Sequence, residues 1–351
     1  MNTEKLKERL LLLLRAAGVF RLTRLLMRRR LLILAYHGVS LFDEAGFNPN
    51  LFITPDTLQQ RLRYLKQQGY TVMPLSAALE ALDRQQLPAN TVVITFDDGW
   101  YSTGAKAAPL LAELSMPFTL YVTSYYVEKN QPVLNVVMRY IFYKSSLEQV
   151  DLSQLQLKQQ PQWVPFTSKA EREILYVQVF AYFTSLPGLS ERLDYVRLLA
   201  QSLRVDIEHH LQQRCFNLLT SSELTKLAEQ GVDLQLHTHR HRMEFSSAES
   251  FLQDIADNRA SLTRICAGDF QHFCYPSGQH TRQAAMLLQQ AGIQSATTCA
   301  PGFVTKHTDR YFLPRFLDGE NISQLLFEAE VTGVLECLRL IKRRTLRLVR
   351  R

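Results

Sequence analysis

The sequence lacks any apolar run long enough to cross a membrane as a helix. Such a helix needs about 18 uninterrupted apolar residues, and arginines interrupt the leucine-rich first 30 residues at Arg15, Arg21, Arg24 and Arg28. A secretory signal is not evident either, because the longest early apolar run, Leu10–Leu14, is shorter than the usual hydrophobic region of roughly 7 residues. We therefore expect a cytoplasmic protein.

Cysteines are few and match no metal or redox motif. Their number is odd and no two are spaced as in a CxxC zinc or dithiol pattern; they are Cys215, Cys266, Cys274, Cys299 and Cys337. We expect reduced thiols, most of them buried. The sequence also lacks internal repeats, low-complexity tracts and a glycine-rich loop opening a helix, which argues against an enzyme that acts on phosphoesters.

Positive charge is scarce in the middle of the chain. The formal net charge is +7, but nine Lys and Arg with two Glu lie in residues 1–30, and seven Lys and Arg with no acid lie in residues 338–351. The remainder holds 24 basic and 31 acidic residues. A nucleic-acid enzyme concentrates positive charge along its working groove, so we expect no nucleic-acid partner.

Both basic ends have the pattern of amphipathic helices. Leucines and cations alternate with helical spacing in the two segments: Leu6, Leu10, Leu13, Leu14, Lys5, Lys7, Arg9 and Arg15 at one end, and Leu338, Ile341, Leu346, Leu348, Arg339, Lys342, Arg343 and Arg344 at the other. Such helices bind anionic membrane surfaces. The alternative is a pair of solvated helices packed on the domain.

Strand-like runs alternate with helical patterns over most of the chain, which predicts a parallel sheet and, with seven or eight repeats, a (β/α)7–8 barrel. The predicted strands are Leu31–Tyr36, Thr71–Pro74, Val92–Phe96, Phe118–Val122, Val232–Leu236, Phe270–Tyr275, Ser295–Cys299 and Tyr311–Phe316. The main predicted helices between them are Thr57–Gln68, Thr103–Leu114, Ser221–Gln230, Ala248–Ile265 and Arg282–Gln290.

Three segments are expected around this repeat: a basic helical segment over residues 1–30, the barrel over residues 31–320, and a second basic helical segment over residues 321–351. Residues 130–219 interrupt the alternation. They have helical patterns over Leu134–Phe142, Lys169–Phe183 and Leu189–Leu203 and no convincing strand. We expect a helical insertion after the fourth strand, on the face where loops are long.

Two short polar motifs follow predicted strands. The run VVITF leads directly into Asp97, Asp98 and Gly99, and the run VDLQL leads into HTHRH, with His237 and His241 four residues apart. Side chains at the carboxyl ends of barrel strands face the reaction site. Two imidazoles and one carboxylate form a metal site with open positions. The alternatives are an ordinary Asp-Gly turn and a solvated histidine loop.

These motifs resemble those of the polysaccharide deacetylase family. TFDDG at 95–99, HTxxH at 237–241 and the YPxG turn at 275–278 occur in the family's order, and the opening LAYHGV at 34–39 is similar to that of a circularly permuted branch. The resemblance implies a distorted barrel and a metal-dependent hydrolase that removes an acetyl group from an N-acetylated sugar. A catalytically silent glycan-binding relative is the alternative.

The resemblance also implies roles for single residues. Asp97 would be the general base that activates a water held by the metal, and one divalent ion, usually zinc, would bind to Asp98, His237 and His241. The backbone N–H of Ser277, after the proline of the third motif, would stabilise the oxyanion.

The sequence departs from the family pattern at two positions. Many members have an arginine where this chain has Cys274, and Arg315 in LPRF is our candidate replacement; its alternative role is an ordinary ion pair. A C-terminal Leu-x-His motif, which supplies the general acid in many members, is not found. His37 on the first strand is the proposed acid, with a buried structural histidine as the alternative.

Trp100 and Tyr275 lie beside these motifs and have rings suited to stacking on a sugar. We expect both to contact the substrate, an N-acetylated saccharide.

Overall fold

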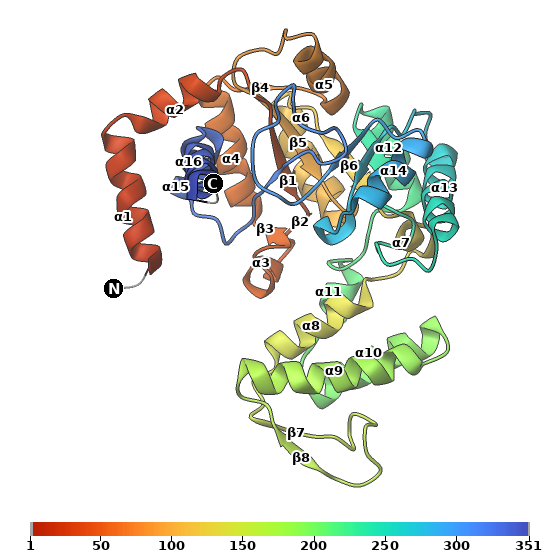
Figure 1. Cartoon of the computed structure of the whole chain (residues 1–351). Coiled ribbons are helices and arrows are strands. Elements are labelled where there is room, and N and C mark those ends of the chain that lie inside the picture. Colours follow the sequence, from red (N-terminus) through yellow and green to blue (C-terminus); the bar gives the residue numbers. More distant parts are fainter. Residues whose placement is uncertain (1–2, 350–351) are drawn as a thin grey trace.

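The computed structural model describes residues 3–349, and the side chains of residues 5–343 and 345. Eight parallel strands form the main sheet of the described chain: β1 (Leu32–Tyr36), β4 (Thr71–Val72), β5 (Thr91–Phe96), β6 (Thr119–Val122), β9 (Asp233–Leu236), β10 (His272–Cys274), β11 (Ser295–Thr297) and β12 (Phe316–Leu317). Their order is β11-β10-β9-β6-β5-β1-β12, with β4 beside the start of β5. The sheet curls into a half-barrel at the centre of the molecule (Figure 1). The predicted α/β barrel class is confirmed.

Strand β5 is the central strand for the site. Its sequence, TVVITF, is rich in β-branched residues and every side chain is buried, as expected for a strand covered on both faces. It pairs with β1 over five residues, from Leu32 opposite Val92 to Tyr36 opposite Phe96. Because the strands are parallel, the residues that follow each of them lie at the same edge of the sheet.

Helices cover the outside of the sheet, as the alternating pattern predicts (Figure 1). They are α4 (Pro55–Gln67), α5 (Leu75–Asp83), a π-helical turn (Thr103–Ala107) continuing into α6 (Ala108–Glu113), α12 (Ser221–Glu229), α13 (Ala248–Ile265) and α14 (Arg282–Gln290). Capping boxes at Thr220 and Ser247 start α12 and α13.

The last predicted strand, Tyr311–Phe316, is wrong over most of its length. Only Phe316 belongs to β12, which pairs with β1, and Leu313 forms a single parallel bridge to Thr297. Pro314 explains the interruption, because it has no N–H to donate to a sheet ladder. The chain therefore runs from a contact with β11, at one edge of the sheet, to β12, which pairs with β1 at the other edge.

The insertion lies below the half-barrel in Figure 1 and is mainly helical. It contains α8 (Leu134–Lys144), α9 (Lys169–Ser185), α10 (Leu189–Ser202) and α11 (Glu208–Gln212), and α7 (Ser124–Lys129) leads into it. The prediction that it holds no strand is wrong: β7 (Gln149–Asp151) and β8 (Trp163–Pro165) form an antiparallel pair. Three residues per strand are too few to show periodicity in the sequence.

The base of the insertion is tied to the loop after β5. Trp100 and Leu218 form an antiparallel bridge, and the Leu219 N–H donates to the Gly99 carbonyl at 2.8 Å. The insertion is therefore joined by backbone hydrogen bonds to the turn that carries Asp97 and Asp98. Nearby, β2 (Gly38–Val39) and β3 (Phe52–Ile53) pair next to α3 (Glu44–Phe47).

The terminal helices pack together on one side of the half-barrel (Figure 1). They are α1 (Thr3–Ala16), α2 (Val19–Met27), α15 (Gln324–Val331) and α16 (Val334–Val349). Leu11, Phe20 and Ala329 belong to their shared core. Within the described residues, no helix is long and apolar enough to span a membrane. The side chains of Arg344, Leu346 and Leu348, part of the predicted amphipathic pattern, lie outside the described residues.

Candidate active site

A left-handed turn after β5 presents the two aspartates. Asp98 has φ 72° and Gly99 has φ 89°, so the chain reverses directly after the strand and both carboxylates stay at its carboxyl end. The Trp100 indole N–H donates to Asp98 Oδ2 at 2.8 Å. This hydrogen bond fixes the carboxylate and leaves Asp98 Oδ1, which is buried and has no hydrogen-bond partner, directed toward the histidines.

Asp98 Oδ1 faces two imidazole nitrogens. His237 Nε2 lies 3.2 Å from it and His241 Nε2 lies 3.1 Å from it. His237 Nδ1 lies 2.8 Å from the Cys274 carbonyl. Because a carbonyl only accepts, Nδ1 must carry the proton. A neutral His237 therefore points the lone pair of Nε2 at a carboxylate oxygen, in a buried place where such an approach is costly unless a cation lies between the two atoms.

The electrostatics of this cluster favour bound positive charge. Burial raises the pKa of Asp98, but the adjacent His241 and His237 hold it well below its usual range. Burial lowers the pKa of His237, but the nearby carboxylates of Asp98 and Asp97 raise it overall. The three side chains thus create a negative, ligand-rich position that a metal ion would neutralise.

A second group of donors, Asp97, His237 and Cys274, is also close enough to hold an ion. It fits a metal less well. Burial raises the pKa of the Cys274 thiol well above its usual value. Both Asp97 oxygens already accept hydrogen bonds from Arg315. In the group of Asp98, His237 and His241, by contrast, Asp98 Oδ1 has no hydrogen-bond partner.

Arg315 forms a two-pronged ion pair with Asp97. Its two terminal nitrogens donate to Asp97 Oδ1 and Oδ2, each at 2.7 Å, and the guanidinium is completely buried. Thr95 Oγ1 and the Thr298 carbonyl accept two further hydrogen bonds from Arg315, each at 3.1 Å. Burial raises the pKa of Asp97, but the Arg315 charge outweighs this and lowers it to about 2. Asp97 is therefore an oriented carboxylate, ionised near neutral pH.

The Cys274 thiol contacts both the Asp97 carboxylate and the Arg315 guanidinium. Its Sγ lies 3.4 Å from Asp97 Oδ2 and 3.0 Å from a terminal nitrogen of Arg315. Arg315, in the segment before β12, therefore contacts both Asp97, the candidate base, and Cys274, the position at which the sequence departs from the family pattern.

The remaining predicted site residues lie around this centre. His37 directly follows β1, is partly exposed, and has its Nε2 3.8 Å from Asp97 Oδ2. Ser277 lies in the turn after β10, is exposed, and has φ 54°. His239 faces away from the cluster: its Nδ1 lies 2.9 Å from Ser124 Oγ.

The predicted aromatic platforms do not offer free ring faces in this structure. Tyr275 is fully buried, and its ring packs against Phe273, His280 and Phe312. Trp100 is 3% exposed and its indole is held by Asp98. Trp100 donates to Asp98 and lines the cavity over the cluster, so its contact with the substrate stays a prediction. The expectation for Tyr275 is corrected, because its ring packs in the core.

Two buried polar residues of α13 support the histidine loop, and the sequence pattern did not reveal them. Asn258 Oδ1 accepts from the His237 N–H at 3.0 Å, and Asp254 Oδ1 accepts from the His239 N–H at 2.6 Å. Their only signal is polar residues four apart on the otherwise apolar face that contains Phe251 and Ile255. That pattern alone does not say which loop they hold.

The cavity over the cluster has a volume of about 240 Å³. Asp98 and His241 line one side of it, and the insertion and the segments near it line the other; its remaining residues are Leu51, Trp100, Thr123, Tyr126, Val133, Asn135, Val136, Leu218 and Arg240. The polar cluster can thus be reached by a small molecule.

The fold and this cluster together define a (β/α)-barrel enzyme with its reactive groups at the carboxyl ends of the strands. A sequence model of the polysaccharide deacetylase family matches residues 84–151 and 202–296. These ranges include Asp97, Asp98, His237 and His241. This match identifies a polysaccharide deacetylase domain in these two stretches of the chain.

Solved structures with the same fold are also deacetylases. The match with the Streptococcus pyogenes deacetylase PplD covers 86% of this chain and 98% of the PplD chain, with 17% identity and a TM-score of 0.57. The match with a de-N-acetylase from Aggregatibacter actinomycetemcomitans covers 85% of this chain and 98% of that chain, with 16% identity and a TM-score of 0.55. The match with IcaB from Ammonifex degensii covers 86% of this chain and 97% of that chain, with 17% identity and a TM-score of 0.54. A sequence comparison with curated proteins gave no match.

Proposed function

We propose that this protein is a metal-dependent hydrolase that removes the acetyl group from an N-acetylated sugar of a polysaccharide or glycoconjugate precursor. The observation that carries the proposal is the convergence of Asp98, His237 and His241 beside an Asp97 carboxylate held by Arg315. The match to the polysaccharide deacetylase family model supports the reaction, as does the likeness to solved structures that are themselves deacetylases.

The spacing of the cluster suits a zinc ion. Two ligands about 2.0–2.2 Å from a tetrahedral zinc ion lie about 3.3–3.6 Å apart, and Asp98 Oδ1 is slightly closer than this to the two imidazole nitrogens, at 3.2 Å and 3.1 Å. The unpartnered Asp98 Oδ1 is the atom that such an ion would satisfy. When bound, the ion would polarise the amide carbonyl and make a water molecule more acidic.

The surrounding residues have separate roles in the proposed reaction. Asp97, ionised and oriented by Arg315, takes the proton of the attacking water. The Ser277 N–H donates to the oxygen that becomes negative as the carbonyl is attacked. His37, 3.8 Å from Asp97, donates a proton to the leaving amine. Acetate and the free amino sugar are the products.

The proposal is tested by measuring metal content and acetate release together on the purified protein. We expect about one equivalent of divalent metal and release of acetate from N-acetylhexosamine oligosaccharides, lost on chelation and regained when zinc is added back. Metal without acetate from any saccharide would favour the silent glycan-binding alternative. A protein that binds no metal would remove the proposed ligand set.

We further propose that the enzyme works at the inner face of an anionic membrane, where a lipid-linked saccharide would be presented. The surface formed by Leu22, Leu25 and Leu26 supports this, because these side chains are 57%, 57% and 61% exposed on α2. Arg21 and Arg28 flank them. Leucines inserted at the membrane interface and cations near anionic lipids both strengthen binding, and each nearby cation contributes about 1 kcal/mol of binding free energy.

Replacing these three leucines by serine is expected to reduce binding to phosphatidylglycerol vesicles at least about tenfold, because apolar burial at the interface is lost. Vesicle sedimentation at low and physiological salt measures the effect. Met286→Ser, which removes an even more exposed apolar side chain (70%) from α14, is the control and should bind as the wild type does. A wild type that binds neither anionic nor zwitterionic vesicles would contradict the membrane location.

A further inference from the structure

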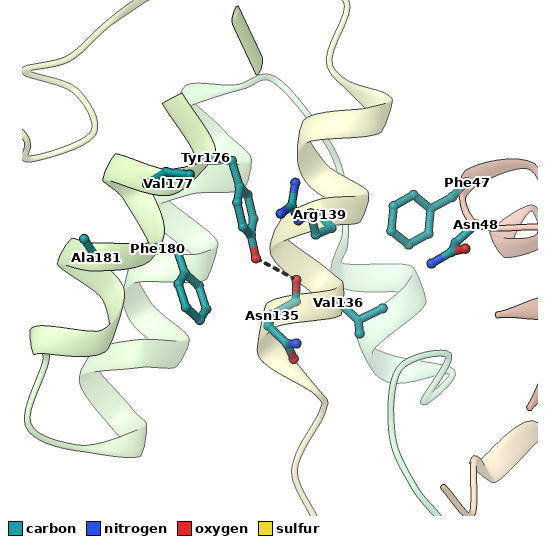
Figure 2. A pocket seen from close by; sticks show the side chains of 9 residues that line it. All are labelled: Phe47, Asn48, Asn135, Val136, Arg139, Tyr176, Val177, Phe180 and Ala181. Atoms are coloured by element: carbon teal, nitrogen blue, oxygen red, sulfur yellow. Dashed lines mark hydrogen bonds between the residues drawn. The ribbon is translucent and has the colours of Figure 1, made fainter. Parts of the chain in front are cut away.

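The cavity over the metal ligands adjoins two larger hollows of the insertion. A hollow of about 500 Å³ lies between α3, α8 and α9 (Figure 2), and another of about 380 Å³ lies between α7, α9 and α10. Asn135 at the start of α8 lines all three. Val136 is shared by the first two, and Phe180 by the two larger ones. The hollows are therefore neighbours that meet at the first turn of α8.

The α8–α9 hollow is an open groove. Val177 is 60% exposed and Phe180 is 36% exposed on α9, and in Figure 2 the Phe180 ring points from α9 toward α8. Tyr176, Phe180 and Phe183 are stacked along α9, with ring centroids 5.8 Å and 6.0 Å apart. Arg139 lies over the Tyr176 ring at 3.5 Å and pairs with Glu173, so its charge is already compensated.

This lining suits neutral sugar rings. A pyranose has apolar C–H faces, which pack on exposed apolar side chains such as Val177 and Phe180, and hydroxyl groups, which hydrogen-bond with amides such as those of Asn48 and Asn135 in the groove. A long hydrocarbon chain is buried best in an enclosed apolar tunnel, whereas this groove is open to solvent and includes the polar side chains of Asn48, Asn135 and Arg139. The compensated charge of Arg139 also makes the groove unattractive for a free anion.

The α9 wall of the groove lies outside the part of the chain that matches the family model. The family model leaves residues 152–201 unmatched, and Tyr176, Val177, Phe180 and Ala181 lie in this stretch. The opposite wall, with Asn135, Val136 and Arg139 on α8, lies inside the matched residues.

We propose that the α8–α9 groove binds the sugar units next to the one that is deacetylated, so that the enzyme prefers an oligosaccharide or longer glycan over a single N-acetylated sugar. This inference rests on the proposed function, because the groove adjoins the same site. An aromatic contact to a sugar ring contributes a free energy that corresponds to about a tenfold gain in affinity.

The test compares two substitutions on one helix. Val177→Lys places a long charged side chain in the groove, whereas Ile174→Lys, at a position that is 64% exposed and outside the groove lining, is the matched control. With N-acetylhexosamine substrates of one to six units, we expect wild-type kcat/KM to rise at least about tenfold with length. Val177→Lys should lose most of this rise and Ile174→Lys should keep it. Phe180→Ala is a second variant that removes the ring instead of blocking the groove.

Direct binding separates this inference from the proposed function. Calorimetric titration with the same saccharides, and with an n-octyl glycoside of an N-acetylhexosamine, is made on wild type and on both lysine variants. Acetate release with no effect of saccharide length on kcat/KM or affinity would contradict sugar binding in the groove and leave the proposed function intact. Length-dependent binding without acetate would support the groove and contradict the function. A gain from the octyl chain but not from added sugars would show that the groove takes an apolar aglycone and would overturn the proposal.

Discussion

Asp97→Asn is expected to lower acetate release by about 10²–10⁴-fold while the protein keeps its metal. The amide has no basic oxygen that can take the proton of the attacking water, and a positioned general base contributes about this factor. The substitution leaves Asp98, His237 and His241 in place, so metal content is expected to stay near one equivalent. The measurement is acetate release at saturating metal, with the metal content determined on the same preparation.

Two companion variants show whether Asp97 is a base or a ligand. Asp98→Asn should lose both metal and activity, because a neutral amide replaces the carboxylate ligand. Cys274→Ser should keep its metal if the ligands are Asp98, His237 and His241. If Asp97→Asn and Cys274→Ser both lose metal instead, the ion binds to the alternative group of Asp97, His237 and Cys274, and Asp97 is a ligand rather than the base.

Arg315→Met is expected to lower the free energy of unfolding by about 3–5 kcal/mol and to reduce activity strongly. Removing one partner of a buried ion pair leaves the other charge uncompensated, and here both partners are almost inaccessible, at 0% for Arg315 and 2% for Asp97. The Thr298 carbonyl and Thr95 hydroxyl also lose a donor. Urea denaturation followed by circular dichroism measures the change.

The double variant Asp97→Asn with Arg315→Met checks the origin of that loss. If the cost arises from the uncompensated Asp97 charge, the double variant should be more stable than Arg315→Met alone, which gives a coupling of at least about 1 kcal/mol. Arg315→Lys keeps a charge but loses the two-pronged geometry, and should be intermediate in both stability and activity. Strictly additive effects would mean that the ion pair does not stabilise the fold.

The local pattern of the sequence was sufficient for the elements that dominate the fold. Helix α13 begins and ends where its periodicity predicts, at Ala248 and Ile265, because one apolar face repeats over 18 residues between a capping serine and the next loop. The runs before Asp97 and His237 form buried strands. Since parallel strands end at one edge, the sequence already indicated that these side chains would meet.

Other features depend on contacts between distant parts of the chain and had little or no local signal. Arg315 reaches Asp97 across 218 residues, and its burial is evident only once the segment before β12 is placed beside β5. Asn258 binds the backbone of His237 from another element. A ring such as that of Tyr275 looks available in the sequence but packs in the core.

The motif residues and the barrel class therefore follow from chemistry that is local in the chain: β-branched runs, helical periodicity and side chains at strand ends. The partner of the base, the support of the histidine loop and the groove along the insertion come from packing, which brings together residues whose separation in sequence carries no information about their distance. Long-range contacts of this kind form only when the sheet curls and the insertion closes against the turn after β5, so only the tertiary structure decides them.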